Sequence, residues 1–200
     1  MSNHYYSEKP TVESEERDWS FSLRGQAFRF YSDRGVFSKQ EVDFGSSLLI
    51  HSFIFPDVKG DLLDVGCGYG PIGISLAAND HKRKVHMVDV NERALALATR
   101  NAERNSVNNV EIYKSNCLDN VLKTDFAVVV TNPPIRAGKK VVHAIFEQAY
   151  EHLKSEGELW IVIQKKQGAP SAIEKLESLF SEVEIVEKKK GYSIIKAKKV

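Results

Sequence analysis

Apolar and polar positions follow different periods in different parts of the chain. Between residues 19 and 31 the apolar residues alternate with polar ones on both sides of a turn at 24–26, which predicts a β-hairpin. A helix is predicted at 42–53. From Gly60 onward, short β-branched runs alternate with helical stripes, which predicts strands at 61–65, 84–89, 109–114, 125–131 and 158–163, and helices at 71–79, 91–105, 138–155 and 170–180.

The order of these elements predicts the fold class. Strands that alternate with helices indicate an α/β sandwich over a mostly parallel sheet. Two last segments, 182–187 and 191–197, meet at Lys190-Gly191 and predict a C-terminal antiparallel hairpin, which makes the sheet seven-stranded. We expect a single domain over 1–200, with an N-terminal hairpin and helix extension at 1–56 and the core at 57–200.

Composition narrows the class of protein. The chain has 200 residues, 42% of them hydrophobic and 28% charged, as in an ordinary soluble domain. Two cysteines give no disulfide framework, which favours a reducing, cytoplasmic setting. No apolar run reaches the ~20 residues that span a bilayer, and the histidines lack metal-ligand spacing, so we expect neither a membrane partner nor a metal.

Charge is uneven although the net charge is only +1. Residues 1–19 carry two basic and five acidic side chains, a balance of 2 − 5 = −3. Residues 182–200 carry six lysines and three glutamates, a balance of 6 − 3 = +3. The lysine-rich end is interpreted as the solvated face of an edge strand.

A glycine-rich loop follows the first core strand and opens a helix. The segment from Asp64 to Gly73 contains glycines that let the backbone turn tightly and approach a ligand, and N–H groups at the helix start favour an anionic group. This DxGxGxG pattern resembles the glycine loop of class I S-adenosylmethionine-dependent methyltransferases. The resemblance implies S-adenosylmethionine as cofactor and assigns its binding to Asp64, Gly66, Cys67, Gly68 and Gly70.

The ends of the next two strands extend this predicted site. Asp89 stands at a strand tip, 23 residues after Gly66, where a carboxylate can accept both hydroxyl hydrogens of a ribose. Val90 follows it in the site. By resemblance to the same methyltransferases, Asn116 contacts the adenine edge and Cys117 flanks its face, together with Leu118. Neither cysteine lies in a loop suited to a nucleophile, which argues against methylation of pyrimidine carbon-5.

The tetrapeptide Asn132-Pro133-Pro134-Ile135 ends a buried strand. Neither proline has an N–H to donate, so the chain leaves the sheet at Asn132, at the edge where open α/β sheets bind ligands. The tetrapeptide resembles the signature of methyltransferases that modify planar nitrogens. That resemblance makes these four residues catalytic, with the Asn132 side-chain oxygen and the Pro133 carbonyl accepting both hydrogens of the target amine, and it places Asn132 beside the cofactor as well.

Three further segments of the sequence resemble one particular family of methyltransferases. Residues 32–38 (SDRGVFS), 42–49 (VDFGSSLL) and 132–139 (NPPIRAGK) resemble the catalytic domain of the small-subunit ribosomal RNA guanine-N2 methyltransferases. The resemblance implies a Rossmann-like fold, guanine N2 in 16S ribosomal RNA as the target, and ribosomal RNA or the small subunit as partner. Ile135 replaces an aromatic residue that stacks on the target base in many relatives, so Phe37, Tyr31 or Trp19 is considered for stacking instead.

Basic residues near the strand ends are candidates for substrate binding. Arg136 and Lys139, with Lys140, Lys165 and Lys166, are interpreted as one rim of the cleft, holding RNA phosphates, or as a generic solvated rim.

Three alternatives to the leading function stay open. They are the same chemistry on transfer-RNA adenine or guanine or on release-factor glutamine, a nicotinamide-dependent oxidoreductase, and a non-catalytic RNA-assembly factor. The oligomeric state is left open.

Overall fold

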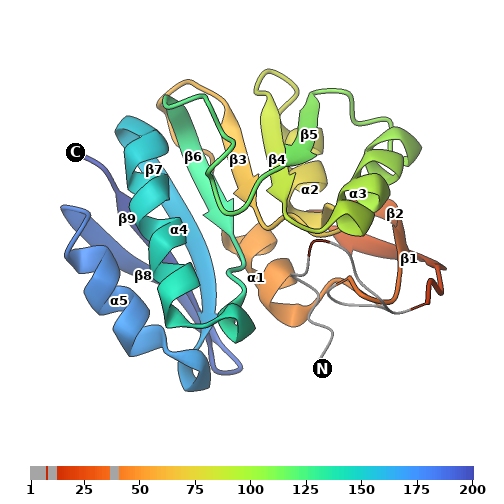
Figure 1. The fold of residues 1–200 in the computed structure, drawn as a ribbon. Helices are drawn as coiled ribbons and strands as arrows, with labels where there is room; N and C mark the ends of the chain where they lie inside the picture. Colours follow the sequence, from red (N-terminus) through yellow and green to blue (C-terminus); the bar gives the residue numbers. More distant parts are fainter. Residues whose placement is uncertain (1–7, 9–12, 37–40) are drawn as a thin grey trace.

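A seven-stranded sheet between two layers of helices forms the centre of the molecule (Figure 1). The computed structural model describes residue 8, residues 13–36 and residues 41–200. The sheet order is β5-β4-β3-β6-β7-β9-β8, with β9 antiparallel to both of its neighbours. The strands are β3 (Leu62–Val65), β4 (Val85–Asp89), β5 (Val110–Lys114), β6 (Phe126–Thr131), β7 (Leu153–Gln164), β8 (Glu182–Lys189) and β9 (Tyr192–Lys198).

The helices divide between the two faces of the sheet. Alternate residues of the central strands point to opposite faces, and both sets are apolar, so both faces are covered. One face packs against α1 (Phe44–Ser52), α2 (Pro71–Asn79) and α3 (Glu92–Arg104). The other packs against α4 (Lys139–His152) and α5 (Ala169–Glu177). The predicted α/β class, the seven strands and the C-terminal hairpin are confirmed.

The N-terminal hairpin, β1 (Arg17–Leu23) and β2 (Gln26–Ser32), lies outside the main sheet. Its two-residue turn has positive φ at Arg24 (51°) and Gly25 (77°), the twist that joins antiparallel strands with the least strain. The Arg24 side chain donates to the backbone oxygens of Ile50 and Phe53, at 2.9 and 2.7 Å. The hairpin is thereby attached to the end of α1.

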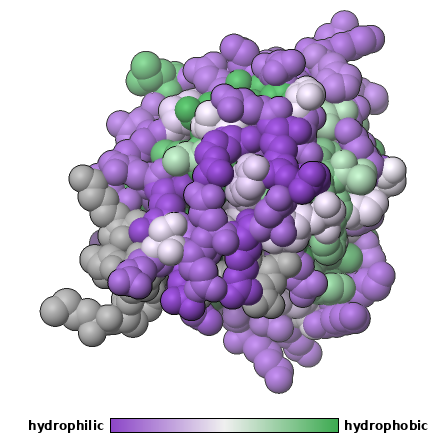
Figure 2. Space-filling model, turned by 90° about the vertical axis from the view of Figure 1, so that its right-hand side faces the viewer, coloured by the Kyte–Doolittle hydropathy of each residue, from purple (hydrophilic) through white to green (hydrophobic). Residues whose placement is uncertain are grey.

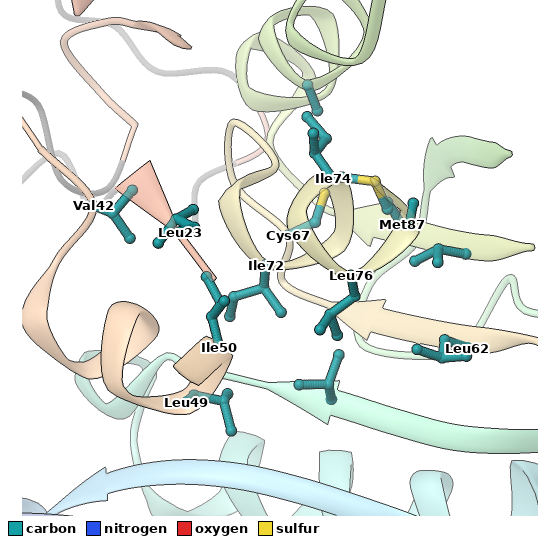
Figure 3. Close-up of a cluster of buried hydrophobic side chains, with 14 of the residues drawn as sticks. Leu23, Val42, Leu49, Ile50, Leu62, Cys67, Ile72, Ile74, Leu76 and Met87 are labelled. Carbon is teal, nitrogen blue, oxygen red and sulfur yellow. The ribbon is translucent and has the colours of Figure 1, made fainter. Parts of the chain in front are cut away.

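One buried apolar cluster joins the hairpin to the core of the sheet. Figure 3 shows Leu23 of the hairpin and Ile50 of α1 close to Ile72 and Leu76 of α2, with Leu62 of β3 farther along. Burying each such side chain contributes about 1.5–3 kcal/mol. The assignment of 1–56 and 57–200 to a single domain stays a prediction, and this shared cluster supports it.

Element boundaries differ from the sequence prediction at β7. The predicted helix 138–155 ends at His152, because Leu153 is extended (φ −79°, ψ 140°) and pairs with Phe126 of β6. β7 therefore starts five residues earlier than predicted. Helix propensity continues through 153–155, but pairing with β6 overrides it. β8 likewise runs to Lys189, two residues beyond its predicted end.

Three strands end together at the carboxyl edge of the sheet. Val65 of β3 pairs with Val88 of β4 on one side and with Thr131 of β6 on the other. The buried Thr131 hydroxyl also donates to the Val65 carbonyl at 2.7 Å. The residues that follow these strands consequently start from the same level of the sheet, where open α/β folds bind ligands.

The end of the molecule formed by α3 and the hairpin is mostly hydrophilic (Figure 2). Ion pairs cross it, among them Arg100 with Glu16 at 2.6 Å and Arg104 with Asp18 at 2.8 Å. None of the helices in the described parts of the chain combines the length and the apolar character needed to cross a membrane.

Candidate functional site

A cleft of about 230 Å³ opens at the carboxyl edge of the sheet. Residues from five separate segments line it, and four of these segments follow β3, β4, β5 and β6. The fifth precedes and begins α1. The lining includes Gly66, Cys67, Gly68, Asp89, Val90, Asn116, Cys117, Asn132, Pro133 and Pro134 of the sequence-predicted residues, and also Asp43, Ser46 and Ser115.

The glycine loop forms the floor of the cleft. The N–H groups of Gly66 and Cys67 both donate to the Val88 carbonyl, at 2.8 and 2.9 Å, which ties the loop to β4. Gly68 has a φ of +57°, and a Cβ placed on it would meet nothing within 4 Å. Gly70 lies behind the loop, and its Cβ would come within 2.6 Å of the Ile74 side chain. Gly68 thus leaves space for a ligand, whereas Gly70 lets helix α2 pack closely.

Asp64 lies behind the cleft and does not line it. The residue is fully buried, and its Oδ2 accepts the Gly73 N–H at 2.9 Å, while its Oδ1 has no hydrogen-bond partner. Burial, with a smaller contribution from the nearby Asp89, raises the pKa of this carboxyl to about 7, and the hydrogen bond from Gly73 opposes the rise. In the structure Asp64 fixes the start of α2 relative to β3.

Asp89 connects the glycine loop to the start of α3. One carboxylate oxygen accepts the Gly68 N–H and the other accepts the Asn91 N–H, both at 2.8 Å. Burial raises the pKa of Asp89, and these hydrogen bonds oppose that effect. The Val90 N–H is a third backbone donor to this carboxylate, and the lone-pair capacity that remains can accept hydrogen from ribose hydroxyls.

The segment after β5 supplies the wall beyond Asp89. Asn116 is exposed at the cleft and donates to Asp119 at 3.1 Å, while Cys117 and Val90 give apolar surface. Leu118, expected beside Cys117, instead lies in the core, 1% exposed. Burial raises the thiol pKa of both Cys67 and Cys117, so neither is an activated nucleophile.

Asn132 follows β6, the strand beside β3, and hydrogen bonds fix the orientation of its amide. Its Nδ2 donates to Ser46 Oγ at 3.0 Å and to Asp43 Oδ2 at 3.3 Å. Because an ionised carboxylate only accepts hydrogen bonds, the amide nitrogen faces Asp43 and the amide oxygen faces away from it. Asp43 is itself held as the N-cap of α1, accepting the Ser46 N–H at 3.1 Å.

The prolines and Ile135 form a tight turn after Asn132. The Pro133 carbonyl accepts the Ile135 N–H at 2.8 Å and keeps one free lone pair. Ile135 begins a short 3₁₀ helix and packs against the cluster beneath α4. It is not among the residues that line the cleft.

Two of the predicted substrate-binding residues, Arg136 and Lys139, are not among the residues that line the cleft. Both are exposed, Arg136 on the short 3₁₀ helix after Pro134 and Lys139 at the first position of α4. Phe37 lies outside the described residues. Of the other aromatic candidates, Trp19 packs against Phe30 and Tyr69, and Tyr31 lies beneath the guanidinium groups of Arg100 and Arg104, so both serve packing.

Sequence reasoning missed Asp43 and Ser46 as site residues. Both stand in the segment 42–49 that carries the family resemblance, but no local pattern indicates that they contact Asn132, 89 and 86 residues away. Ser115 was also missed; its hydroxyl accepts the Asn120 N–H at 3.1 Å. The spacing of the segment 42–49 before the glycine loop was the available signal.

The geometry fits a nucleoside-containing cofactor. Asp89 can receive a ribose diol, Gly68 leaves room beside it, and Val90 and Cys117 offer apolar contact to a ring. Asn132 faces this position with a free amide oxygen. Within the described part of the chain, no group of three or more His, Cys, Asp or Glu side chains is arranged to hold a metal.

Comparison with known proteins gives consistent matches. A model of the methyltransferase small domain family matches residues 27–196. The chain is 67% identical over 201 residues to "Uncharacterized protein YbxB" of Bacillus subtilis, covering 100% of both chains. It is 40% identical over 132 residues to ribosomal RNA small subunit methyltransferase C of Aeromonas hydrophila, which is 64% of this chain and 37% of that protein.

A solved structure matches over nearly the whole chain. The 16S rRNA N2 methyltransferase RsmC of T. thermophilus, in complex with AdoMet and guanosine, superposes with a TM-score of 0.82 at 25% identity. The match covers 96% of this chain and 52% of that one. The chain therefore spans about half, or less, of the length of the named ribosomal RNA methyltransferases it matches.

Proposed function

The chain belongs to the methyltransferase small domain family, and from this premise we propose that it is an S-adenosylmethionine-dependent methyltransferase acting on guanine N2 of small-subunit ribosomal RNA. The observation that carries the proposal is the Asn132 amide. Its nitrogen donates to Asp43 and Ser46, which leaves its oxygen to accept a hydrogen from a planar amine.

The cofactor half of the proposal rests on the floor of the cleft. Asp89 would hold the ribose hydroxyls, Gly66 and Gly68 would approach the amino-acid portion, and Val90, Asn116 and Cys117 would surround the adenine. When bound, S-adenosylmethionine supplies an electrophilic methyl group on a sulfonium. Asp64 shapes this floor from behind, through Gly73.

The target half rests on two fixed acceptors. An exocyclic amine has its lone pair delocalised into the ring, and accepting both of its hydrogens favours a pyramidal nitrogen. Asn132 Oδ1 and the free lone pair of the Pro133 carbonyl would accept these hydrogens, and the two prolines stiffen the turn that carries them. Correct positioning in well-oriented systems supplies up to ~7–11 kcal/mol of the barrier reduction.

Arg136 and Lys139 stay candidates for holding phosphates near this turn. The resemblance to a guanosine-bound enzyme favours guanine over adenine.

The decisive assay offers labelled S-adenosylmethionine to small ribosomal subunits, naked small-subunit RNA, transfer RNA and release factor in parallel. We expect label in small-subunit RNA, recovered as N2-methylguanosine after digestion and mass spectrometry. Label only in transfer RNA or release factor would select the corresponding alternative.

A deletion strain gives the matching test in the cell. Small-subunit RNA from a strain that lacks the gene should lose N2-methylguanosine relative to the parent strain. Restoring the parent gene should restore the modification, while an Asn132→Ala gene should not. Unchanged N2-methylguanosine content in the deletion strain contradicts the proposed substrate.

A further inference from the structure

The lysines of the C-terminal hairpin are not equivalent. At the end that holds the C-terminus, Lys196 pairs with Glu184 at 2.6 Å and Lys198 pairs with Glu156 at 2.5 Å. Lys199 donates to two backbone carbonyls at 2.7 Å. Their charges are therefore balanced or used within the fold, as expected for the face of an edge strand.

At the other end of the same hairpin the lysines are exposed. Among the described residues, none makes an ion pair with Lys188, Lys189 or Lys190. Lys190 only places its Nζ 4.9 Å from the centre of the Phe44 ring. Lys165, on the next turn, is exposed and has no ion pair either. Four uncompensated positive charges are thus collected in one place, which costs repulsion unless an anion balances them.

This turn lies at the same edge of the sheet as the cleft. Gln164, at the end of β7, pairs with Tyr192, and the Lys165 N–H donates to the Gly191 carbonyl at 2.8 Å. Since β7 runs parallel to β6, its end is on the side where Asn132 leaves the sheet. Figure 1 shows the β8–β9 turn and the starts of α4 and α5 along this edge of the molecule.

A groove with lysine walls and an apolar floor occupies this region. Its lining includes the four lysines, and its apolar surface comes from Ile173, Ile185 and Tyr192. Ile185 is 40% exposed, which is unusual for a large apolar side chain in this chain. We refer to this feature, formed by residues 165, 169, 170, 173, 185 and 188–193, as the lysine groove.

An aromatic contact links the lysine groove to the start of α1, which holds Asn132. The Tyr192 ring packs against Phe44, with 5.4 Å between centroids. A Cβ on Gly45 would lie 3.0 Å from this ring, so the glycine lets the ring pack closely against the start of α1. Phe44 and Gly45 stand between Asp43 and Ser46, the two residues that orient Asn132.

We propose that the lysine groove binds the phosphate backbone of a single-stranded segment of RNA whose target base enters the cleft. The inference rests on the proposed function, because the base must reach Asn132. Lysines bind phosphates as point charges, and apolar and aromatic surfaces between them accept unstacked bases. An acidic polypeptide would match the charges but carries no base to present to the amine acceptors of the cleft.

Paired charge removals test this surface. Lys188→Gln/Lys189→Gln removes two charges from the groove and leaves Lys190 and the site untouched. Lys59→Gln/Lys82→Gln removes two exposed charges just before β3 and β4, at the opposite edge of the sheet. Binding of a short fluorescent oligoribonucleotide is measured by anisotropy over a range of salt concentrations, with polyglutamate as the second probe.

The groove variant should bind the oligoribonucleotide severalfold more weakly and lower the salt slope by about 1.4, since each single-strand phosphate contact contributes about 0.7. The control variant should match the parent protein. Equal loss in both variants, no loss in the groove variant, or no salt-dependent binding by the parent protein overturns the inference. Loss confined to polyglutamate overturns it in favour of an acidic protein partner.

These measurements need no methyl transfer, so they separate the inference from the proposed function. A protein that binds RNA through the groove but leaves it unmethylated refutes the proposed reaction alone. In an active enzyme, the groove variant should raise the KM for RNA and leave the affinity for S-adenosylmethionine at the parent value. Lowered cofactor affinity would indicate a structural defect and overturn the assignment of these lysines to RNA.

Discussion

The nucleoside wall of the cleft, formed by residues 66–68, Asp89 and Val90, is held by backbone N–H groups. The amide wall, formed by Asn132 with Asp43 and Ser46, is held by side chains. In the first, Gly68 and Asn91 donate to the Asp89 carboxylate across 21 and 2 residues of sequence. In the second, Asn132 reaches across 89 residues to Asp43. Local turns thus build one wall, and the N-terminal extension completes the other.

The two walls also differ in electrostatics. Burial raises the pKa of Asp64 and Asp89 on the nucleoside side, so two carboxyl groups lie close together in a region of low polarity. The amide wall pairs a neutral amide with a half-buried carboxylate that also caps a helix. We infer that the nucleoside wall costs stability when it is ionised, whereas the amide wall stabilises α1 as it orients Asn132.

The largest expected effect concerns Asp64 and folding stability. Its folded-state pKa of about 7 lies above its ordinary value of 3.8, so the stabilising contribution is complete below about pH 4 and is lost as the pH rises to about 7. The shift corresponds to on the order of 4 kcal/mol. Asp64→Asn should remove this pH dependence, so the free energy of unfolding of the variant should rise relative to the parent protein between these pH values.

Urea unfolding at a series of pH values measures this difference. Asp125→Asn serves as control, because the exposed Asp125 carboxyl has a pKa lowered by Lys123, and its contribution has the opposite sign. Its stabilisation is present above the ordinary pKa and is lost as the pH falls. If the free energies of unfolding of Asp64→Asn and of the parent protein change with pH in the same way, the pKa of Asp64 is not raised in the folded protein.

The second effect concerns turnover at the amide wall. Asn132→Ala removes the acceptor for the target amine and should lower kcat by about a hundredfold or more, the usual loss when one aligned transition-state contact is removed. Cofactor affinity should stay near the parent value, because Asp89 holds the ribose. Single-turnover transfer of labelled methyl groups measures the rate. The comparison variant Asn116→Ala should instead weaken cofactor binding, because Asn116 lies in the wall after β5. A normal rate of methyl transfer in Asn132→Ala would refute the catalytic role of Asn132.

The third effect concerns affinity at the nucleoside wall. Asp89→Ala should weaken binding of S-adenosylmethionine by about 1.5–3 kcal/mol, the range of hydrogen bonds to charged groups. In the parent protein the affinity should fall as the pH drops through the raised pKa of Asp89, since a protonated carboxyl cannot accept both ribose hydrogens. Calorimetric titration measures both, and Glu92→Ala, an exposed neighbour, should change neither. Unaltered affinity in Asp89→Ala would place the ribose elsewhere.

The contrast between the walls explains what the sequence could reveal. The strands, the helices and the positions of Asp89 and Asn132 at strand ends follow from local pattern and were predicted. The contact of Asn132 with Asp43 depends on how the extension packs over the sheet, which no local signal gives. Ile135 shows the same limit, because its place in the tetrapeptide predicts a role at the target, while its 3₁₀ turn directs it to the cluster beneath α4.

Boundaries failed where tertiary pairing overrode local preference. Residues 153–155 continue the helical pattern of α4, yet Leu153 pairs with Phe126. The lysines of 182–200 look alike in the sequence but lie in two different environments, paired at one end of the hairpin and exposed at the other. Only the register of β8 and β9 shows which lysine lies at which end. The glycine loop, by contrast, was predictable because its positive φ values require glycine at the positions where it occurs.

The smallest effect tests how the amide wall orients Asn132. One oxygen of Asp43, Oδ2, accepts both the Ser46 N–H and the Asn132 NH₂. Asparagine caps helices as well as aspartate does, and its oxygen in that position keeps both hydrogen bonds, so Asp43→Asn should preserve α1 and kcat. Asp43→Ala removes both bonds and leaves the Ser46 hydroxyl to orient Asn132, so kcat should fall about tenfold, the loss of one ordinary hydrogen bond. Cofactor affinity should not change in either variant, and a normal kcat in Asp43→Ala would show that Asn132 keeps its orientation without Asp43.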